Sequence, residues 1–145
     1  MNDLITRDLI VMNLESSCKE DVIKAMAKLI GENDRLYDQE KYIEMVFERE
    51  KTFPTSLGFE VAIPHGKTDA VKIPTLAFAK LNNEIKWSEE ENVKYVFLIA
   101  VPEKEAGDLH LQILAQISRK LMRDEFREAL KNSSEKDELL KLLTA

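Results

Sequence analysis

The strongest constraint on the fold is the run YVFLIAV at residues 95–101, in which every residue is hydrophobic. A strand with one face in solvent alternates apolar and polar residues, whereas a strand covered on both faces is hydrophobic throughout. The run therefore predicts a central strand, and its sheet needs a layer of helices on each face.

Three further strands are expected, at residues 10–14, 61–66 and 75–80, from β-branched and alternating apolar residues. The short connection between the last two leaves their relative direction open. The hydrophobic content of 44% in 145 residues suits one core and is too small for two typical domains. We expect a single domain spanning residues 1–145, and the initial methionine favours a freestanding protein.

Five helices are expected from apolar residues at helical spacing. The first should start at a capping box of Ser17 and Glu20 and close at Gly31, and Asp38 should cap the second. The last three should begin at Asp108, Asp124 and Ser134. The order β-α-α-β-β-β-α-α-α predicts an α/β fold, α+β by strict usage: a three-layer α/β/α sandwich with a mixed sheet of about four to five strands.

The net charge of −6, from 21 Lys and Arg against 27 Asp and Glu, argues against nucleic acid as a partner. No apolar stretch approaches the roughly 18 residues of a membrane span and no leader pattern is present, so a cytoplasmic location is expected. The single cysteine, Cys18, cannot form an internal disulfide, and two histidines make a poor zinc site. We expect no cofactor and no metal.

The sequence VAIPHG at residues 61–66 stops an apolar run at a histidine. Pro64 cannot donate to a sheet ladder and Gly66 permits a sharp turn, so His65 should lie at a strand end with its ring facing outwards. Histidine offers a neutral, nucleophilic nitrogen near neutral pH. From these residues alone, a polar turn residue without chemistry stays an open alternative.

In a wider window, the spacing from Glu50 through Leu57 and Gly58 to residues 61–66 resembles the active-site histidine signature of the enzyme IIA domains of the fructose and mannitol class (PTS EIIA type 2). These domains belong to the bacterial phosphoenolpyruvate-dependent sugar phosphotransferase system. The resemblance covers nearly the whole chain, including residues 49–50, 75–81, 96–102 and 107–111.

The resemblance implies a phosphotransferase whose partners are other proteins of that system. His65 would accept a phosphoryl group from the histidine phosphocarrier protein (HPr) and pass it to a cysteine of the EIIB component. The EIIC membrane permease would be served indirectly, in sugar uptake of a fructose-like kind. Charge compensation needs no metal, because no acidic cluster with magnesium spacing is present and an arginine can supply positive charge.

Arg49, Thr55 and His110 are the further site residues that the resemblance implies. The planar guanidinium of Arg49 can engage two phosphate oxygens, although a surface arginine at a helix end is equally compatible with the residues alone. Thr55 is a possible hydroxyl donor or a turn residue. His110 lies on the apolar face of its helix, where a core histidine is the default, and its match to the family's second histidine makes it auxiliary.

The pair Phe59-Glu60 departs from the commoner family form, in which small or amide residues are frequent. Glu60 would add negative charge near a phosphate site unless strand alternation turns it away, and Phe59 is a candidate for an apolar docking surface.

A second hypothesis is a regulatory module, in which phosphorylation of His65 controls binding to a transcription regulator or another protein. Genes for EIIB and EIIC alongside would indicate transport, and an isolated gene would indicate regulation. Metal binding or hydrolysis ranks last, since a third ligand and a nucleophile elbow are lacking.

Overall fold

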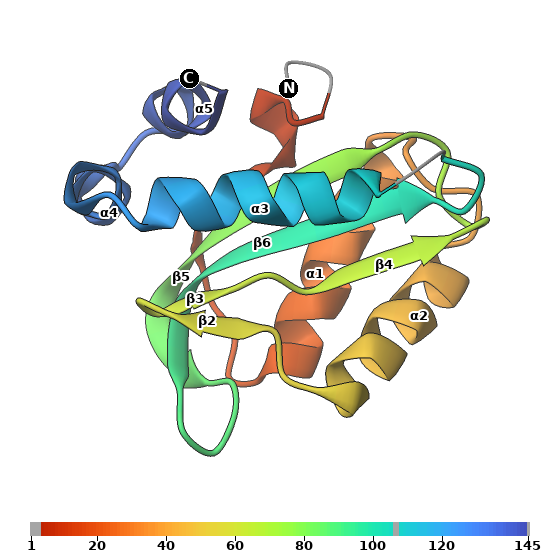
Figure 1. Ribbon diagram of the computed structural model, residues 1–145, viewed down its shortest axis with the longest axis horizontal. Coiled ribbons are helices and arrows are strands. Elements are labelled where there is room, and N and C mark those ends of the chain that lie inside the picture. The colour runs from red at the N-terminus through yellow and green to blue at the C-terminus, as the bar shows by residue number, and fades with distance from the viewer. Residues whose placement is uncertain (1–3, 106–107, 145) are drawn as a thin grey trace.

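The computed structural model describes residues 4–105 and 108–144, and a sheet with helices on both faces accounts for most of them (Figure 1). The strands are β1 (Ile10–Leu14), β2 (Ser56–Gly58), β3 (Val61–Ala62), β4 (His65–Thr68), β5 (Thr75–Lys86) and β6 (Asn92–Pro102). The helices are the 3-10 turn η1 (Arg7–Leu9), α1 (Lys19–Glu32), α2 (Gln39–Thr52), α3 (Leu109–Leu121), α4 (Asp124–Asn132) and α5 (Lys136–Thr144).

Strand β6 lies inside the sheet, whose order is β1-β5-β6-β3-β2 with β4 also paired to β6. β5 runs antiparallel to β6, while β3 and β4 run parallel to it, so the sheet is mixed. Residues 95–101 of β6 are all buried. The apolar run therefore forms the predicted central strand, and the direction that the sequence left open is settled: β4 and β5 flank β6 with opposite directions.

Helices α1 and α2 cover one face of the sheet, and α3 crosses the other face (Figure 1). The chain then passes through α4 to α5, which packs against β1 and η1. Phe78 of β5 and Phe97 of β6 are paired in register and pack with their ring centroids 4.9 Å apart in the core. The three-layer α/β/α sandwich agrees with the prediction.

Within the described residues the mixed sheet comprises six strands, where about four to five were expected. Pro64 has no N–H to donate, and the segment expected as one strand divides on either side of it into β3 and β4. Residues 56–58, which precede β3, form the short strand β2, which pairs antiparallel with β3.

Some predicted helix ends are correct and others are not. Asp38 caps α2 as predicted, because its carboxylate accepts the N–H of Lys41 at 3.1 Å. The capping box of Ser17 and Glu20 is wrong: Cys18 is the N-cap of α1 and makes no side-chain cap bond. α1 also continues through Gly31 to Glu32.

Candidate functional site

His65 begins β4 beside β6, directly opposite Ile99. The next residue, Gly66, lies against α2: a Cβ atom there would come within 3.1 Å of Val46 Cγ2 and 3.2 Å of Tyr42 Cε1. Tyr42 is itself anchored, since its hydroxyl donates to the Ile99 carbonyl at 2.8 Å. The glycine therefore lets α2 pack closely on β4, and this brings the C-terminal turn of α2 towards the histidine.

The His65 ring is partly buried and its two nitrogens have different roles. Nδ1 lies 3.0 Å from the carbonyl oxygen of Ile63. A carbonyl oxygen can only accept, so Nδ1 carries the ring proton and Nε2 keeps its lone pair. This is the tautomer that a nucleophile acting through Nε2 requires.

Burial lowers the pKa of His65 below its ordinary value of 6.5, and electrostatic interactions with Arg49 and His110 lower it further. The hydrogen bond to Ile63 and the negative charge of Glu50 act in the opposite direction. The net direction is downwards, which keeps the imidazole neutral and nucleophilic at neutral pH.

His110 lies in the first turn of α3, on the face of the sheet opposite α2. The two ring centroids are 6.2 Å apart and the ring planes are inclined by 33°. Nδ1 of His110 is buried and has no hydrogen-bond partner among the described residues. The first turn of a helix also carries the positive end of its dipole, which favours an anion nearby. The structure thus brings together the two histidines that the sequence singled out.

Arg49 lies in the last turn of α2, as predicted, and its positive charge lowers the pKa of His65. One guanidinium nitrogen, Nη1, donates to the carbonyl of Phe53 at 2.8 Å. A guanidinium has further N–H groups in the same plane, so this contact orients Arg49 and leaves donors for an anion.

Thr55 is buried, and its hydroxyl donates to the carboxylate of Glu50. Its backbone N–H points to the same carboxylate, 3.3 Å from Oε1. A hydroxyl has a single proton, so Thr55 can donate to a phosphoryl oxygen once its bond to Glu50 breaks.

Glu50 is a residue of the site for which the sequence analysis gave no role. It lies at i+8 from Tyr42 and i+4 from Val46, and all three are buried on one face of α2. A carboxylate at the end of a buried helical stripe is the signal that could have identified it, because a buried charge requires specific partners.

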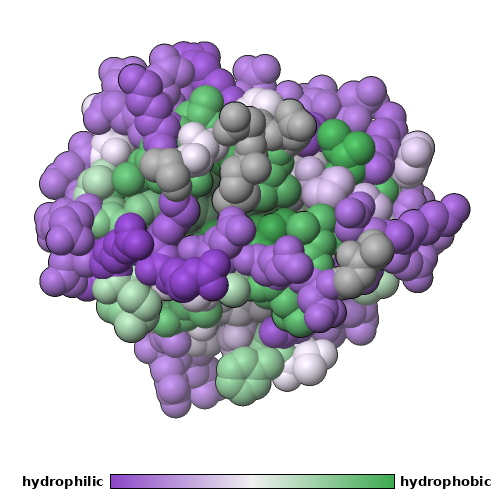
Figure 2. Space-filling model, turned by 45° about the horizontal axis from the view of Figure 1, so that its top comes forward, coloured by the Kyte–Doolittle hydropathy of each residue, from purple (hydrophilic) through white to green (hydrophobic). Residues whose placement is uncertain are grey.

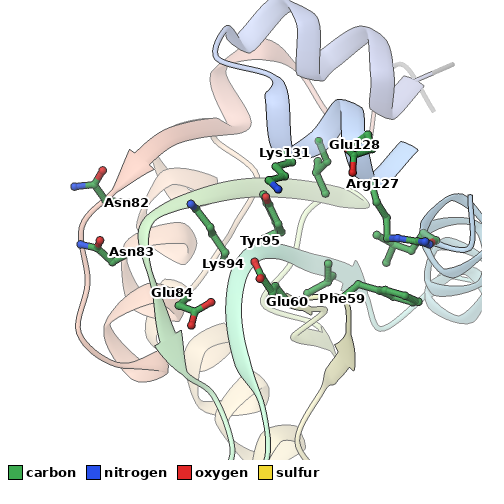
Figure 3. Close-up of a pocket in the computed structure, with 13 residues that line it drawn as sticks. Phe59, Glu60, Asn82, Asn83, Glu84, Lys94, Tyr95, Arg127, Glu128 and Lys131 are labelled. Atoms are coloured by element: carbon green, nitrogen blue, oxygen red, sulfur yellow. The ribbon is translucent and has the colours of Figure 1, made fainter. Parts of the chain in front are cut away.

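Phe59 and Glu60 form the turn between β2 and β3, with φ of 55° and 64°. Glu60 lines a cleft of about 560 Å³ together with Lys94 and Tyr95 (Figure 3). The guanidinium of Arg127 lies over the Phe59 ring, 4.3 Å from its centroid. The residues lining this cleft do not include His65, so the departure from the family pattern is accommodated away from the histidine.

The surface seen in Figure 2 is mainly hydrophilic, with apolar side chains gathered near the middle of that face. Three exposed apolar residues, Met45, Phe53 and Leu111, are close to the site in the chain or in contact with it. Leu111 follows His110, the Phe53 carbonyl binds Arg49, and the Cγ of Met45 lies 3.5 Å from the Cβ position of Gly66.

In residues 4–105 and 108–144, no group of three His, Cys, Asp or Glu side chains is arranged to hold a metal ion. Over the same residues, no helix combines the length and apolarity needed to cross a bilayer.

Comparison with known families gives a match over residues 3–145 to the model described as "Phosphoenolpyruvate-dependent sugar phosphotransferase system, EIIA 2". The fructose-specific EIIA component of Haloferax volcanii is 36% identical over 89% of this chain and 84% of its own length. The 2-O-alpha-mannosyl-D-glycerate-specific EIIABC component of Escherichia coli is 34% identical over 99% of this chain. The chain spans 22% of that protein, and it spans a similarly small part of several other curated relatives.

Solved structures share the fold over nearly the whole chain. The nitrogen regulatory protein IIA-Ntr of Neisseria meningitidis superposes with a TM-score of 0.88 at 28% identity and covers 97% of both chains. The mannitol enzyme IIA of Escherichia coli, solved in complex with its phosphorylated enzyme IIB, gives a TM-score of 0.82 at 25% identity, with 97% of this chain and 96% of that chain covered.

Proposed function

The chain belongs to the EIIA 2 family of the phosphoenolpyruvate-dependent sugar phosphotransferase system, and from this premise we propose that it is a phosphocarrier in which His65 carries the phosphoryl group. His65 would receive the group from HPr and deliver it to the EIIB component. The observation that carries the proposal is the setting of the His65 ring: Nδ1 faces the Ile63 carbonyl at 3.0 Å, which leaves the lone pair on Nε2, while the charge of Arg49 acts on the ring and the His110 ring centroid lies 6.2 Å away.

Transfer to His65 is an in-line displacement at phosphorus. The lone pair of Nε2 forms a new N–P bond while the P–N bond of the donor phosphohistidine breaks, and the electron pair of the broken bond returns to the donor imidazole. The Nδ1 proton stays on His65, where the Ile63 carbonyl stabilises the positive charge that develops on the ring. In the second step a cysteine sulfur of EIIB attacks the same phosphorus, and the bonding pair returns to Nε2.

Positive groups around His65 stabilise the phosphoryl oxygens in this proposal. Arg49 binds them with the N–H groups that do not contact Phe53. His110 donates a ring N–H from the other side, and the first turn of α3 adds its dipole. Thr55 contributes its hydroxyl after exchanging its bond with Glu50.

Protein partners fit the exposed apolar residues close to the site, because carrier contacts combine a small apolar centre with a polar rim. The proposed EIIB partner is supported by the mannitol enzyme IIA neighbour, which was solved with its phosphorylated IIB. A fructose-like sugar is supported by the fructose-specific relative from Haloferax volcanii. The EIIC permease, as an indirect partner, and the cytoplasmic location remain parts of this proposal.

The regulatory role is the second candidate, and it draws on the likeness to the nitrogen regulatory protein IIA-Ntr. Both candidates require phosphoryl uptake at His65, and they differ in what happens next. Transport predicts discharge to an EIIB protein, whereas regulation predicts that phosphorylation changes the binding of a protein outside the sugar route.

Both half-reactions can be followed by NMR on protein whose histidine rings are labelled with ¹⁵N. We expect phosphorylated HPr to place phosphorus on Nε2 of His65, seen by a coupling between phosphorus and that ¹⁵N nucleus. Addition of EIIB should then return the His65 signals to their starting positions. Phosphorus on Nδ1 would contradict the proposed tautomer, and a phosphohistidine that EIIB does not discharge would favour the regulatory role.

A further inference from the structure

Glu50 is a buried carboxylate, 5% exposed, at the C-terminal end of α2. Burying a charged carboxylate is costly unless it is paired and hydrogen-bonded. The described partners are the backbone N–H and the hydroxyl of Thr55 and, more distantly, Lys19, whose Nζ lies 3.7 Å from Oε2. The carboxylate thus connects the end of α2 with the loop before β2 and with the start of α1.

Thr55, which Glu50 binds, in turn binds Ile63, two residues before the histidine. The carbonyl of Thr55 accepts the N–H of Ile63 at 3.1 Å. The carbonyl of the same Ile63 accepts the Nδ1 proton of His65 at 3.0 Å. A continuous series of hydrogen bonds therefore runs from Glu50 through Thr55 and Ile63 to the His65 ring.

We propose that Glu50 is a positioning residue for His65, which holds the ring and its Nδ1–H tautomer through Thr55 and Ile63; the catalytic meaning of this role rests on the phosphoryl relay proposed above. The neighbouring residue contributes to the same loop, because Arg49 binds the Phe53 carbonyl at 2.8 Å. Two consecutive side chains of α2 thereby fix the loop at residues 53 and 55, and in the proposed function Arg49 also binds the phosphoryl group.

The chemistry of Glu50 suits this role better than that of a neutral residue. A carboxylate accepts two donors from Thr55 at once, and bonds to an ionised acceptor are stronger than neutral ones. Displacement of an attacking atom by about 1 Å can cost roughly a hundredfold in rate, so a small shift of Ile63 is sufficient to impair transfer.

The test compares Glu50→Ala, which removes the acceptor, with Glu50→Gln, which keeps one acceptor oxygen. Glu48→Gln is the matched control on the same helix, since its side chain is 71% exposed. Ring ¹⁵N correlations of unphosphorylated protein report the His65 tautomer, and single-turnover uptake from phosphorylated HPr reports the rate. We expect Glu50→Ala to show mixed tautomers and at least about a tenfold slower uptake, with Glu50→Gln between it and wild type.

Thr55→Val tests the route. It keeps the shape of the side chain and removes the hydroxyl, and the readout is the His65 tautomer of unphosphorylated protein, which a direct contact of that hydroxyl with a phosphoryl group does not affect. The double variant with Glu50→Ala should show no more mixing of tautomers than Glu50→Ala alone. Additive shifts of the ring signals would mean that Glu50 acts independently of the Thr55 hydroxyl and would overturn the proposal.

A folded Glu50→Ala protein with the wild-type tautomer and uptake rate would also overturn it, even if thermal stability falls. If Glu50→Ala does not fold, Glu50→Gln decides: shifted ring signals support the role, and signals identical to those of Glu48→Gln refute it. The tautomer is read without phosphorylation. If the wild type takes up no phosphoryl group, the proposed function is contradicted. The ring signals would still show whether Glu50 positions His65.

Discussion

Nδ1 of His65 lies 3.0 Å from the carbonyl oxygen of Ile63, two residues earlier in the chain. This contact makes the two ring nitrogens chemically distinct, because the proton must sit on the atom that faces the carbonyl. Nε2 is consequently the nitrogen with a free lone pair.

Arg49→Gln should slow phosphoryl uptake about a hundredfold, in the range found when one charged or preorganised donor is removed from a transition state. The same change should raise the pKa of His65, because the charge of Arg49 lowers it. Single-turnover uptake and an NMR titration of the ring measure the two effects. Lys51→Gln is the control, since that side chain is 74% exposed on the same helix. Equal rates for the two variants would exclude Arg49 from the site.

The titration of His65 should have its midpoint below 6.5, because burial lowers its pKa. Between that midpoint and 6.5, the unfolded chain binds a proton that the folded protein does not bind. The free energy of unfolding should therefore fall as the pH decreases through this window and level off, for this group, below the folded midpoint.

Urea unfolding at a series of pH values checks this effect, with His65→Asn as the comparison. The variant lacks the titrating ring, so its stability should depend less on pH across the window. A midpoint above 6.5 in the wild type would contradict the neutral imidazole that the relay requires.

Gly66→Ala should destabilise the fold by about 1–3 kcal/mol, the usual cost of overpacking. The new Cβ would lie 3.1 Å from Val46 and 3.2 Å from Tyr42, and the hydroxyl of Tyr42 is fixed on Ile99. The urea midpoint measures the loss.

Gly31→Ala provides the contrast. Its Cβ would meet Oε1 of Gln39, the end of a flexible side chain, and alanine is preferred over glycine inside a helix. The expected change in stability is therefore close to zero or favourable. A Gly66→Ala protein as stable as Gly31→Ala would mean that α2 is not held closely against β4.

The parts of the fold that the sequence predicted are those governed by burial and local caps. Residues 95–101 are hydrophobic on both faces and form the central strand, and Asp38 has the short side chain that accepts a helix N–H. The setting of His65 between Pro64 and Gly66 drew attention to it, and the family resemblance over the wider window assigned it the phosphoryl-acceptor role. Its contact with Ile63 is local, two residues back in the chain, whereas its contact with His110 depends on how α3 packs on the sheet, and no local pattern encodes that contact.

The wrong or missed predictions have a related cause, since a local pattern does not show how the chain packs around it. Ser17 and Glu20 have capping-box spacing, yet α1 starts with Cys18 as its N-cap. Phe59 and Glu60 adopt positive φ at a tight turn, a conformation that their residue types do not announce. Glu50 could have been noticed on the buried face of α2, whereas its partner Thr55 becomes apparent only when the loop is folded back.

The most direct test of the central claim is intact mass after incubation with phosphoenolpyruvate, enzyme I and HPr, for the wild type, His65→Ala and His110→Ala. The account predicts one acid-labile phosphoryl group on the wild type, none on His65→Ala, and one gained more slowly by His110→Ala. No gain of mass by the wild type with an active carrier would contradict the phosphocarrier function. Loss of the group only in His110→Ala would reverse the roles of the two histidines.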